Sequence, residues 1–132
     1  MRGDQRDEDN ETVRISITTV SGGESAREDG TQIVIFTIID DDTSGFTVAE
    51  SSGTSVSEAG STDTFTVVLN SKPTGNVVFN ITSGDTGEAT VSPSTLTFTT
   101  GNWNSAQTVT VTGINDDIDD GNVNSTTTIA IN

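Results

Sequence analysis

Apolar and polar residues alternate along several short stretches of this chain. Between residues 12 and 20, Val13, Ile15 and Ile17 are separated by polar residues, and residues 64–69 repeat the pattern. A period of two places every second side chain on the same face of an extended strand, so one face is buried and the other faces water. We therefore predict half-buried strands over residues 12–20, 64–69, 107–112 and 126–131, and more uniformly apolar or shorter strands over residues 32–39, 46–48, 76–81 and 96–98.

The stretches between these strands are rich in Gly, Asn and Ser, and the strong helix formers Leu, Ala, Lys and Glu are scarce. Strands that recur about every 8–12 residues with turn signals between them are typical of β-sandwiches. We predict an all-β chain that forms an immunoglobulin-like Greek-key β-sandwich of about seven strands. With 30% hydrophobic residues the core is expected to be thin, and Trp103 is the candidate to close one end of it.

An acidic motif occurs near both ends of the chain. Residues 4–10 and residues 116–122 share the pattern Asp-x-x-Asp-acid-x-Asn, and each precedes a run rich in Thr and Ile. The two motifs are 112 positions apart, the difference between positions 116 and 4. We therefore expect the chain to start and stop at nearly the same point of one repeating unit.

The strand count divides the chain after the Asp-Asp-Asp run at residues 40–42. Residues 43–132 supply about six strands and end after the equivalent of strand 12–20, so the equivalent of strand 32–39 is missing. We expect residues 1–42 to form the C-terminal hairpin of a preceding module or a donor-strand segment, and residues 43–132 to form a sandwich that lacks its last strand.

Two routes could use the extra hairpin. It could fold back within the chain, or it could pair with a neighbouring chain by β-strand addition. Residues 43–45 are too short to cross a sandwich roughly 30 Å long at about 3.5 Å per residue, so folding back requires residues 46–57 to move as well.

The charge balance restricts the partners that this chain can bind. Asp and Glu number 20 against 5 Lys and Arg, which gives a formal net charge of −15. Phosphate groups would be repelled, so nucleic acid is not an expected partner, and no apolar run is long enough for membrane insertion.

The chain has no Cys and no His, so a bound metal must be held by oxygen ligands. Clustered carboxylates with backbone carbonyls favour Ca²⁺.

Several motifs follow one another in a definite order. They are Ser-Val-Ser-Glu-Ala-Gly at residues 55–60, Glu-Ala-Thr-Val-Ser-Pro-Ser-Thr-Leu-Thr-Phe at residues 88–98, Gln-Thr-Val-Thr-Val at residues 107–111, and Ile-Asn-Asp-Asp at residues 114–117. Their order and spacing resemble the Calx-β module, which occurs in sodium–calcium exchangers, integrin β4 and many bacterial surface proteins. The resemblance covers the whole chain as the end of one module and most of the next.

This resemblance implies a seven-stranded sandwich with Ca²⁺ held among loops at one end. In the second module the implied ligands are Glu58, Glu88, Asp116, Asp117, the main-chain carbonyl of Ile118, and Asp120. In the preceding module they are Asp4, Asp7 and Glu8, with Asp40, Asp41 and Asp42 as the terminal acidic run. Asn115 and Gln5 stand where the family often has Asp, and no second Asp-Asp-Asp run follows residue 120 in this sequence.

We expect a calcium-binding structural module of an extracellular or cell-surface protein, adhesive or fibrous, in which Ca²⁺ stiffens the joins between successive sandwiches. The expected partners are identical or similar modules, in tandem or head to tail. The alternatives are a filament subunit completed by donor-strand exchange and a regulatory calcium-sensor domain. We expect no enzymatic activity, because the chain lacks the His and Cys of nucleophilic triads and has no aromatic platforms around its carboxylates.

Overall fold

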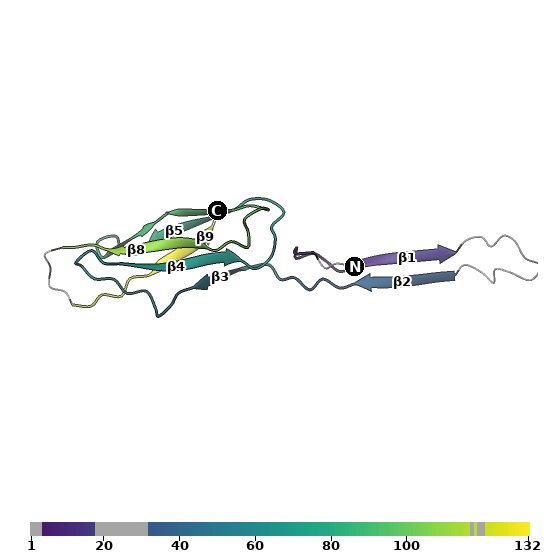
Figure 1. The fold of residues 1–132 in the computed structure, drawn as a ribbon, viewed down its shortest axis with the longest axis horizontal. Helices are drawn as coiled ribbons and strands as arrows, with labels where there is room; N and C mark the ends of the chain where they lie inside the picture. Colours follow the sequence, from purple (N-terminus) through teal and green to yellow (C-terminus); the bar gives the residue numbers. More distant parts are fainter. Residues whose placement is uncertain (1–3, 18–31, 117, 119–120) are drawn as a thin grey trace, which may run out of the picture.

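The computed structural model describes residues 4–17, 32–116, 118 and 121–132. These residues form strands and turns and no helix, which confirms the all-β prediction, and none of them form a helix with the length and hydropathy of a membrane span. The strands, shown in Figure 1, are β1 (Glu11–Ile17), β2 (Gln32–Ile38), β3 (Phe46–Ala49), β4 (Thr62–Leu69), β5 (Val77–Ser83), β6 (Ala89–Ser92), β7 (Thr95–Phe98), β8 (Gln107–Gly113) and β9 (Thr127–Ile131).

The described strands form three antiparallel sheets. One has four strands in the order β3-β4-β8-β6, the second has three in the order β7-β5-β9, and the third is the hairpin β1-β2. The first two share one hydrophobic core, as the layers of a β-sandwich do. The immunoglobulin-like Greek-key connection stays a prediction. Figure 1 shows the hairpin extending away from the sandwich along the long axis of the molecule.

The core lies between the two larger sheets and follows the alternation of the sequence. Phe65, Val67 and Leu69 of β4 are buried as predicted. The opposite sheet contributes Phe79 of β5 and Phe98 of β7, whose rings meet edge to face with centroids 5.9 Å apart. The remaining buried hydrophobic residues are Ile81, Ala89, Leu96, Val109 and Val111. Trp103 is partly buried and packs against this cluster.

The sequence analysis missed strand β6. Residues 89–92 contain one β-branched apolar residue, Val91, and are only four residues long, so the sequence pattern is too short to indicate a strand. The structure pairs them with the C-terminal half of β8, where Val91 lies opposite Val111. Tertiary pairing with a longer strand therefore decides the conformation of this segment.

The predicted half-burial of β1 is wrong for this chain. β1 and β2 pair along seven positions, from Glu11 opposite Ile38 to Ile17 opposite Gln32. Neither strand pairs with a third strand in the described part of the chain, so Ile15 is 52% exposed and Ile35 is 64% exposed. Alternation in a sequence shows which face of a strand is apolar, but it does not show whether another layer covers that face.

The sandwich is also open along β9 and β3. Ile129 of β9 is partly buried as predicted, but Ile131 is 66% exposed although it lies opposite the buried Phe79 in the register of β5 and β9. On the facing sheet, Phe46 and Val48 of the edge strand β3 are exposed, and the Phe46 ring contacts the Phe79 ring with centroids 4.9 Å apart. A strand added beside β9 would cover this side of the core.

Candidate metal centre

The acidic residues of segments 4–10 and 40–42 gather where the hairpin joins the sandwich. Residues 4–10 precede β1 and residues 39–45 connect β2 to β3. Because β1 and β2 run antiparallel, the segment that enters the first strand and the segment that leaves the second lie side by side, as Figure 1 shows. Two acidic runs that are distant in sequence are thus brought together by one hairpin.

Hydrogen bonds fix these two segments to each other. The Asp40 carboxylate accepts hydrogen bonds from the Glu8 backbone N–H at 2.8 Å and from the Asp42 backbone N–H at 3.2 Å. The Asp40 backbone N–H donates to Asn10 Oδ1 at 2.9 Å. The Asp7 carboxylate accepts from the Ser44 backbone N–H at 3.1 Å.

The same junction is attached to the sandwich through the turn that follows β4. The Lys72 backbone N–H donates to the carbonyl oxygen of Gln5, and the Asn70 backbone N–H donates to the carbonyl oxygen of Gly45 at 2.9 Å. Asp4 is near this contact, and its carboxylate accepts a hydrogen bond from the Arg6 backbone N–H at 3.1 Å. The acidic junction therefore has backbone contacts to both the hairpin and the sandwich.

The carboxylates of this junction influence one another electrostatically. One carboxylate oxygen from each of Asp40, Asp41 and Asp42 lies within 4.8 Å of the others. The pKa of Asp42 is raised, first by desolvation and then by repulsion from neighbouring aspartates, which are Asp40, Asp41, Asp4 and Asp7. The pKa of Asp7 is lowered instead, because the Ser44 hydroxyl and backbone N–H donate to its carboxylate.

The arrangement fits the donor chemistry of a calcium site. Ca²⁺ takes six to eight oxygen ligands at about 2.3–2.6 Å, so two oxygens on opposite sides of one ion lie about 5 Å apart. The oxygens of Asp40, Asp41 and Asp42, which lie within 4.8 Å of one another, are compatible with that spacing. The adjacent Asp4 and Asp7 are close enough to add negative charge at the same place.

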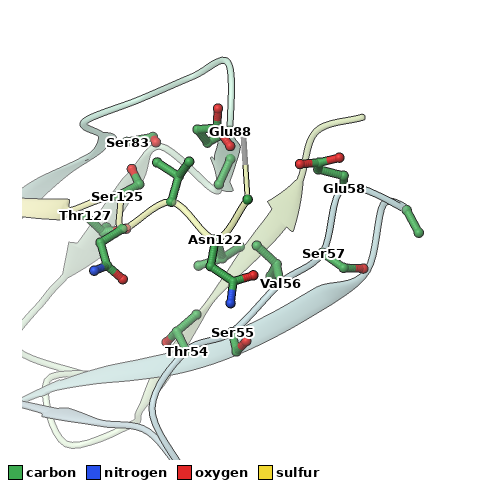
Figure 2. Close-up of a pocket in the computed structure, with 16 residues that line it drawn as sticks. Thr54, Ser55, Val56, Ser57, Glu58, Ser83, Glu88, Asn122, Ser125 and Thr127 are labelled. Atoms are coloured by element: carbon green, nitrogen blue, oxygen red, sulfur yellow. The ribbon is translucent and has the colours of Figure 1, made fainter. Parts of the chain in front are cut away.

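The predicted site of the second module is only partly assembled in the described residues. Glu58 and Glu88 line one cavity of about 670 Å³, together with Asn122 and Ser125 of the segment before β9. Figure 2 shows these side chains around the cavity. Asp116 does not line it. The Asp116 carboxylate accepts a hydrogen bond from the Ile118 backbone N–H at 2.9 Å, and the exposed Ile118 side chain extends into solvent.

Two predicted ligands of that site, Asp117 and Asp120, lie outside the described residues. The loop is connected to the cavity by the Ile114 backbone N–H, which donates to the Glu88 carbonyl oxygen at 2.8 Å. Within the part of the chain that the structure describes, Asp40, Asp41 and Asp42 form a group of three acids close enough to share an ion, and Glu58, Glu88 and Asp116 do not.

The sequence analysis gave no role to two residues that organise the junction. Asn10 accepts the backbone hydrogen bond of Asp40, and Ser44 donates to Asp7. Asn10 ends the repeated motif Asp-x-x-Asp-acid-x-Asn, so its position in that motif was a usable signal. No sequence pattern marked Ser44, because its contact with Asp7 forms only where the chain turns back after β2.

Asp63 is hydrogen-bonded to Ser55, which lines the cavity, and its carboxylate predicts a pH dependence of stability. Its carboxylate accepts hydrogen bonds from the backbone N–H groups of Ser55 at 2.9 Å and Thr64 at 2.7 Å, and these lower its pKa. A lowered folded-state pKa contributes stability above the unfolded-state pKa, and that stability is lost as the pH falls through the folded-state value. We expect Asp63→Asn to lower the unfolding free energy. The decrease should reach its full size above about pH 5 and become progressively smaller below about pH 4.

Urea denaturation of the natural chain and of Asp63→Asn from pH 7 to pH 2.5 measures this difference. A difference that stays constant over the whole range would show that the carboxylate charge contributes nothing.

A scan against protein-family models, a search of curated proteins and a search of solved structures find no match to this chain.

Proposed function

We propose that this protein is a calcium-binding structural module in which the ion is held at the junction between the hairpin and the sandwich. The observation that carries the proposal is the gathering of five aspartates from two distant segments, where desolvation and then repulsion from the other four raise the pKa of Asp42. Carboxylates crowded in this way repel one another, and a divalent cation would convert the repulsion into attraction.

The ligands we assign are the carboxylates of Asp40, Asp41 and Asp42, with Asp4 and backbone carbonyls of residues 4–8 completing the shell. Asp7 and Glu8 act on the same site from the other segment. Asp7 anchors the connector through Ser44, and Glu8 holds Asp40 through its backbone N–H. The chain has neither His nor Cys, so this oxygen-only donor set selects a hard cation.

The consequence of binding is mechanical. The junction connects the hairpin to the sandwich through residues 39–45 and through the backbone contact between Lys72 and Gln5. An ion coordinated by residues of both acidic segments would restrict movement of the hairpin relative to the sandwich. Successive modules would then keep a fixed orientation. Extracellular modules commonly bind Ca²⁺ with Kd values of about 10⁻⁴–10⁻³ M, so a surface or fibrous protein is the setting in which such a site is filled.

We expect millimolar Ca²⁺ to raise the thermal stability of the full chain relative to chelator. An ion that binds only the folded state at a hundredfold excess over its Kd adds about 2.7 kcal/mol to the unfolding free energy. Thermal denaturation in Ca²⁺, in Mg²⁺ and in chelator, followed by isothermal titration calorimetry, measures the effect. Identical melting curves in Ca²⁺ and chelator would refute the proposal.

Asp42→Asn separates ion binding from charge repulsion. Because the pKa of Asp42 is raised in the folded state, its charge destabilises the folded chain at neutral pH, so the variant should be more stable than the natural chain in chelator. In Ca²⁺ the order should reverse, with the affinity lowered roughly tenfold by the loss of one ligand. Glu50→Gln is the matched control, since it removes one exposed charge at the far end of β3 and should leave calcium affinity unchanged.

A further inference from the structure

β2 and β9 are edge strands without the usual protection against pairing. In the described part of the chain, β2 pairs only with β1, and β9 pairs only with β5. Neither Gln32–Ile38 nor Thr127–Ile131 contains a charged residue or a proline, although the chain carries a net charge of −15. Monomeric proteins usually protect such edges with charges, prolines, bulges or very short strands. The absence of this protection indicates that both edges become covered.

The side chains around the β9 edge match an added strand. Ile131, Phe46 and Val48 are exposed on the open side of the core, where a strand beside β9 would lie across from β3. Both faces of β2 are apolar and exposed, with Ile33 and Ile35 on one face and Val34 and Phe36 on the other. Whichever face turned toward the core, β2 would cover the open side with apolar side chains.

The repeated motif identifies the occupant. β1 and β9 each follow a copy of Asp-x-x-Asp-acid-x-Asn, so they occupy the same place in the repeating unit. The strand that pairs with β1 over its whole length is β2. β2 therefore has side chains that suit a partner of the β9 type, and because β1 occupies one edge of β2, such a partner can pair only with the other edge. In Figure 1 the hairpin points away from its own sandwich, so β2 can reach a β9 strand only in a second copy.

We propose that the free edge of β2 in one copy pairs antiparallel with β9 of a second copy, so that the copies join head to tail. The donor and acceptor are different surfaces, and two joined copies together retain one free donor and one free acceptor, so the assembly grows as an open chain. Main-chain hydrogen bonds supply the attraction between the strands, and the apolar side chains fix the register. This inference does not depend on calcium, and its experiments are done in chelator to keep the two proposals separate.

A cysteine scan tests the pairing directly, because the natural chain contains no cysteine. The acceptor copy carries Thr128→Cys, a position next to the partly buried Ile129 on the exposed face of β9. Five donor copies carry one cysteine each, at Ile33, Val34, Ile35, Phe36 or Thr37. Each donor is mixed with a mass-tagged acceptor and oxidised at equilibrium, and the yield of the mixed disulfide is measured by mass spectrometry.

We expect cross-linking yields that alternate along β2, high at every second position and several-fold lower at the positions between. Paired strands present only alternate residues on one face, and directly opposite residues are close enough for a disulfide. Equal yields at neighbouring positions, or no mixed disulfide at any of the five, would overturn the proposal.

Ile35→Lys tests the same strand pairing without a cross-linking reaction. Ile35 is exposed in the isolated chain, so the variant should fold normally by circular dichroism. Sedimentation velocity in about 0.15 M salt, where the Debye length is about 8 Å, should show self-association weakened by roughly tenfold or more. Thr12→Lys adds the same charge to β1 and should associate like the natural chain. A natural chain that stays monomeric, or equal association of both variants, would contradict the proposal.

Discussion

Replacement of Phe98 by alanine is expected to destabilise the sandwich by about 3–5 kcal/mol, the range for removing a buried aromatic side chain. Phe98 has no exposed surface and lies in β7, where its ring meets the edge of Phe79. The core contains few other aromatic side chains, so the residues around Phe98 cannot readily fill the cavity that the substitution leaves. Because small domains are stable by only about 5–15 kcal/mol, the variant should unfold at a much lower urea concentration.

Phe36→Ala is the control for this prediction. Phe36 lies in β2 and is more than half exposed, so the same truncation should change the unfolding free energy by about 0.5 kcal/mol or less in dilute monomer. Comparable losses in the two variants would show that the core between the two larger sheets is not the source of stability.

Gly113→Ala is expected to cost about 3 kcal/mol, near the upper end of the range for overpacking a buried position. Gly113 ends β8, and its backbone N–H donates to the Ser61 carbonyl oxygen at 3.0 Å. A Cβ atom at this position would lie 2.8 Å from the Ser57 carbonyl carbon and even closer to the Ser57 carbonyl oxygen. The obstacle is backbone, so no rotation of a side chain relieves the contact, and the segment before β4 must shift.

Gly75→Ala provides the matched control for this variant. A Cβ atom at Gly75 has no neighbouring atom within 4 Å, and Gly75 needs no left-handed backbone conformation. Its unfolding free energy should therefore stay within about 0.5 kcal/mol of the natural chain. Chemical denaturation of both variants gives the comparison, and equal stability of Gly113→Ala and Gly75→Ala would contradict the assigned close approach.

Alternation was sufficient to find most strands of the sandwich. The pattern predicts one buried face formed by Phe65, Val67 and Leu69, and the structure buries all three. Their strand lies in the middle of a sheet, so one of its faces always points to the core. The same reasoning failed for Val13 and Ile15. Their pattern is equally regular, but burial depends on a second layer, and a sequence pattern contains no information about which layer is present.

The candidate site was predictable as a set of residue types and less so as an arrangement. The absence of His and Cys and the density of Asp limit the chemistry of a metal site to oxygen ligands on the sequence alone. The meeting of residues 4–8 with residues 40–42 required the antiparallel register of β1 and β2. The backbone contact between Lys72 and Gln5 depends on tertiary folding alone, and no local pattern marks it.

The position of the aspartate run directly after β2 has a consequence for the solution behaviour of the chain. Gln32–Ile38 is uncharged, free of proline and rich in β-branched residues, which is the composition of segments that stack into cross-β fibrils. Asp40, Asp41 and Asp42 act as gatekeepers, because stacked copies would place their charges on top of one another. The raised pKa of Asp42 means that this carboxylate loses its charge at a higher pH than an ordinary aspartate, so acidification weakens the protection first at this position.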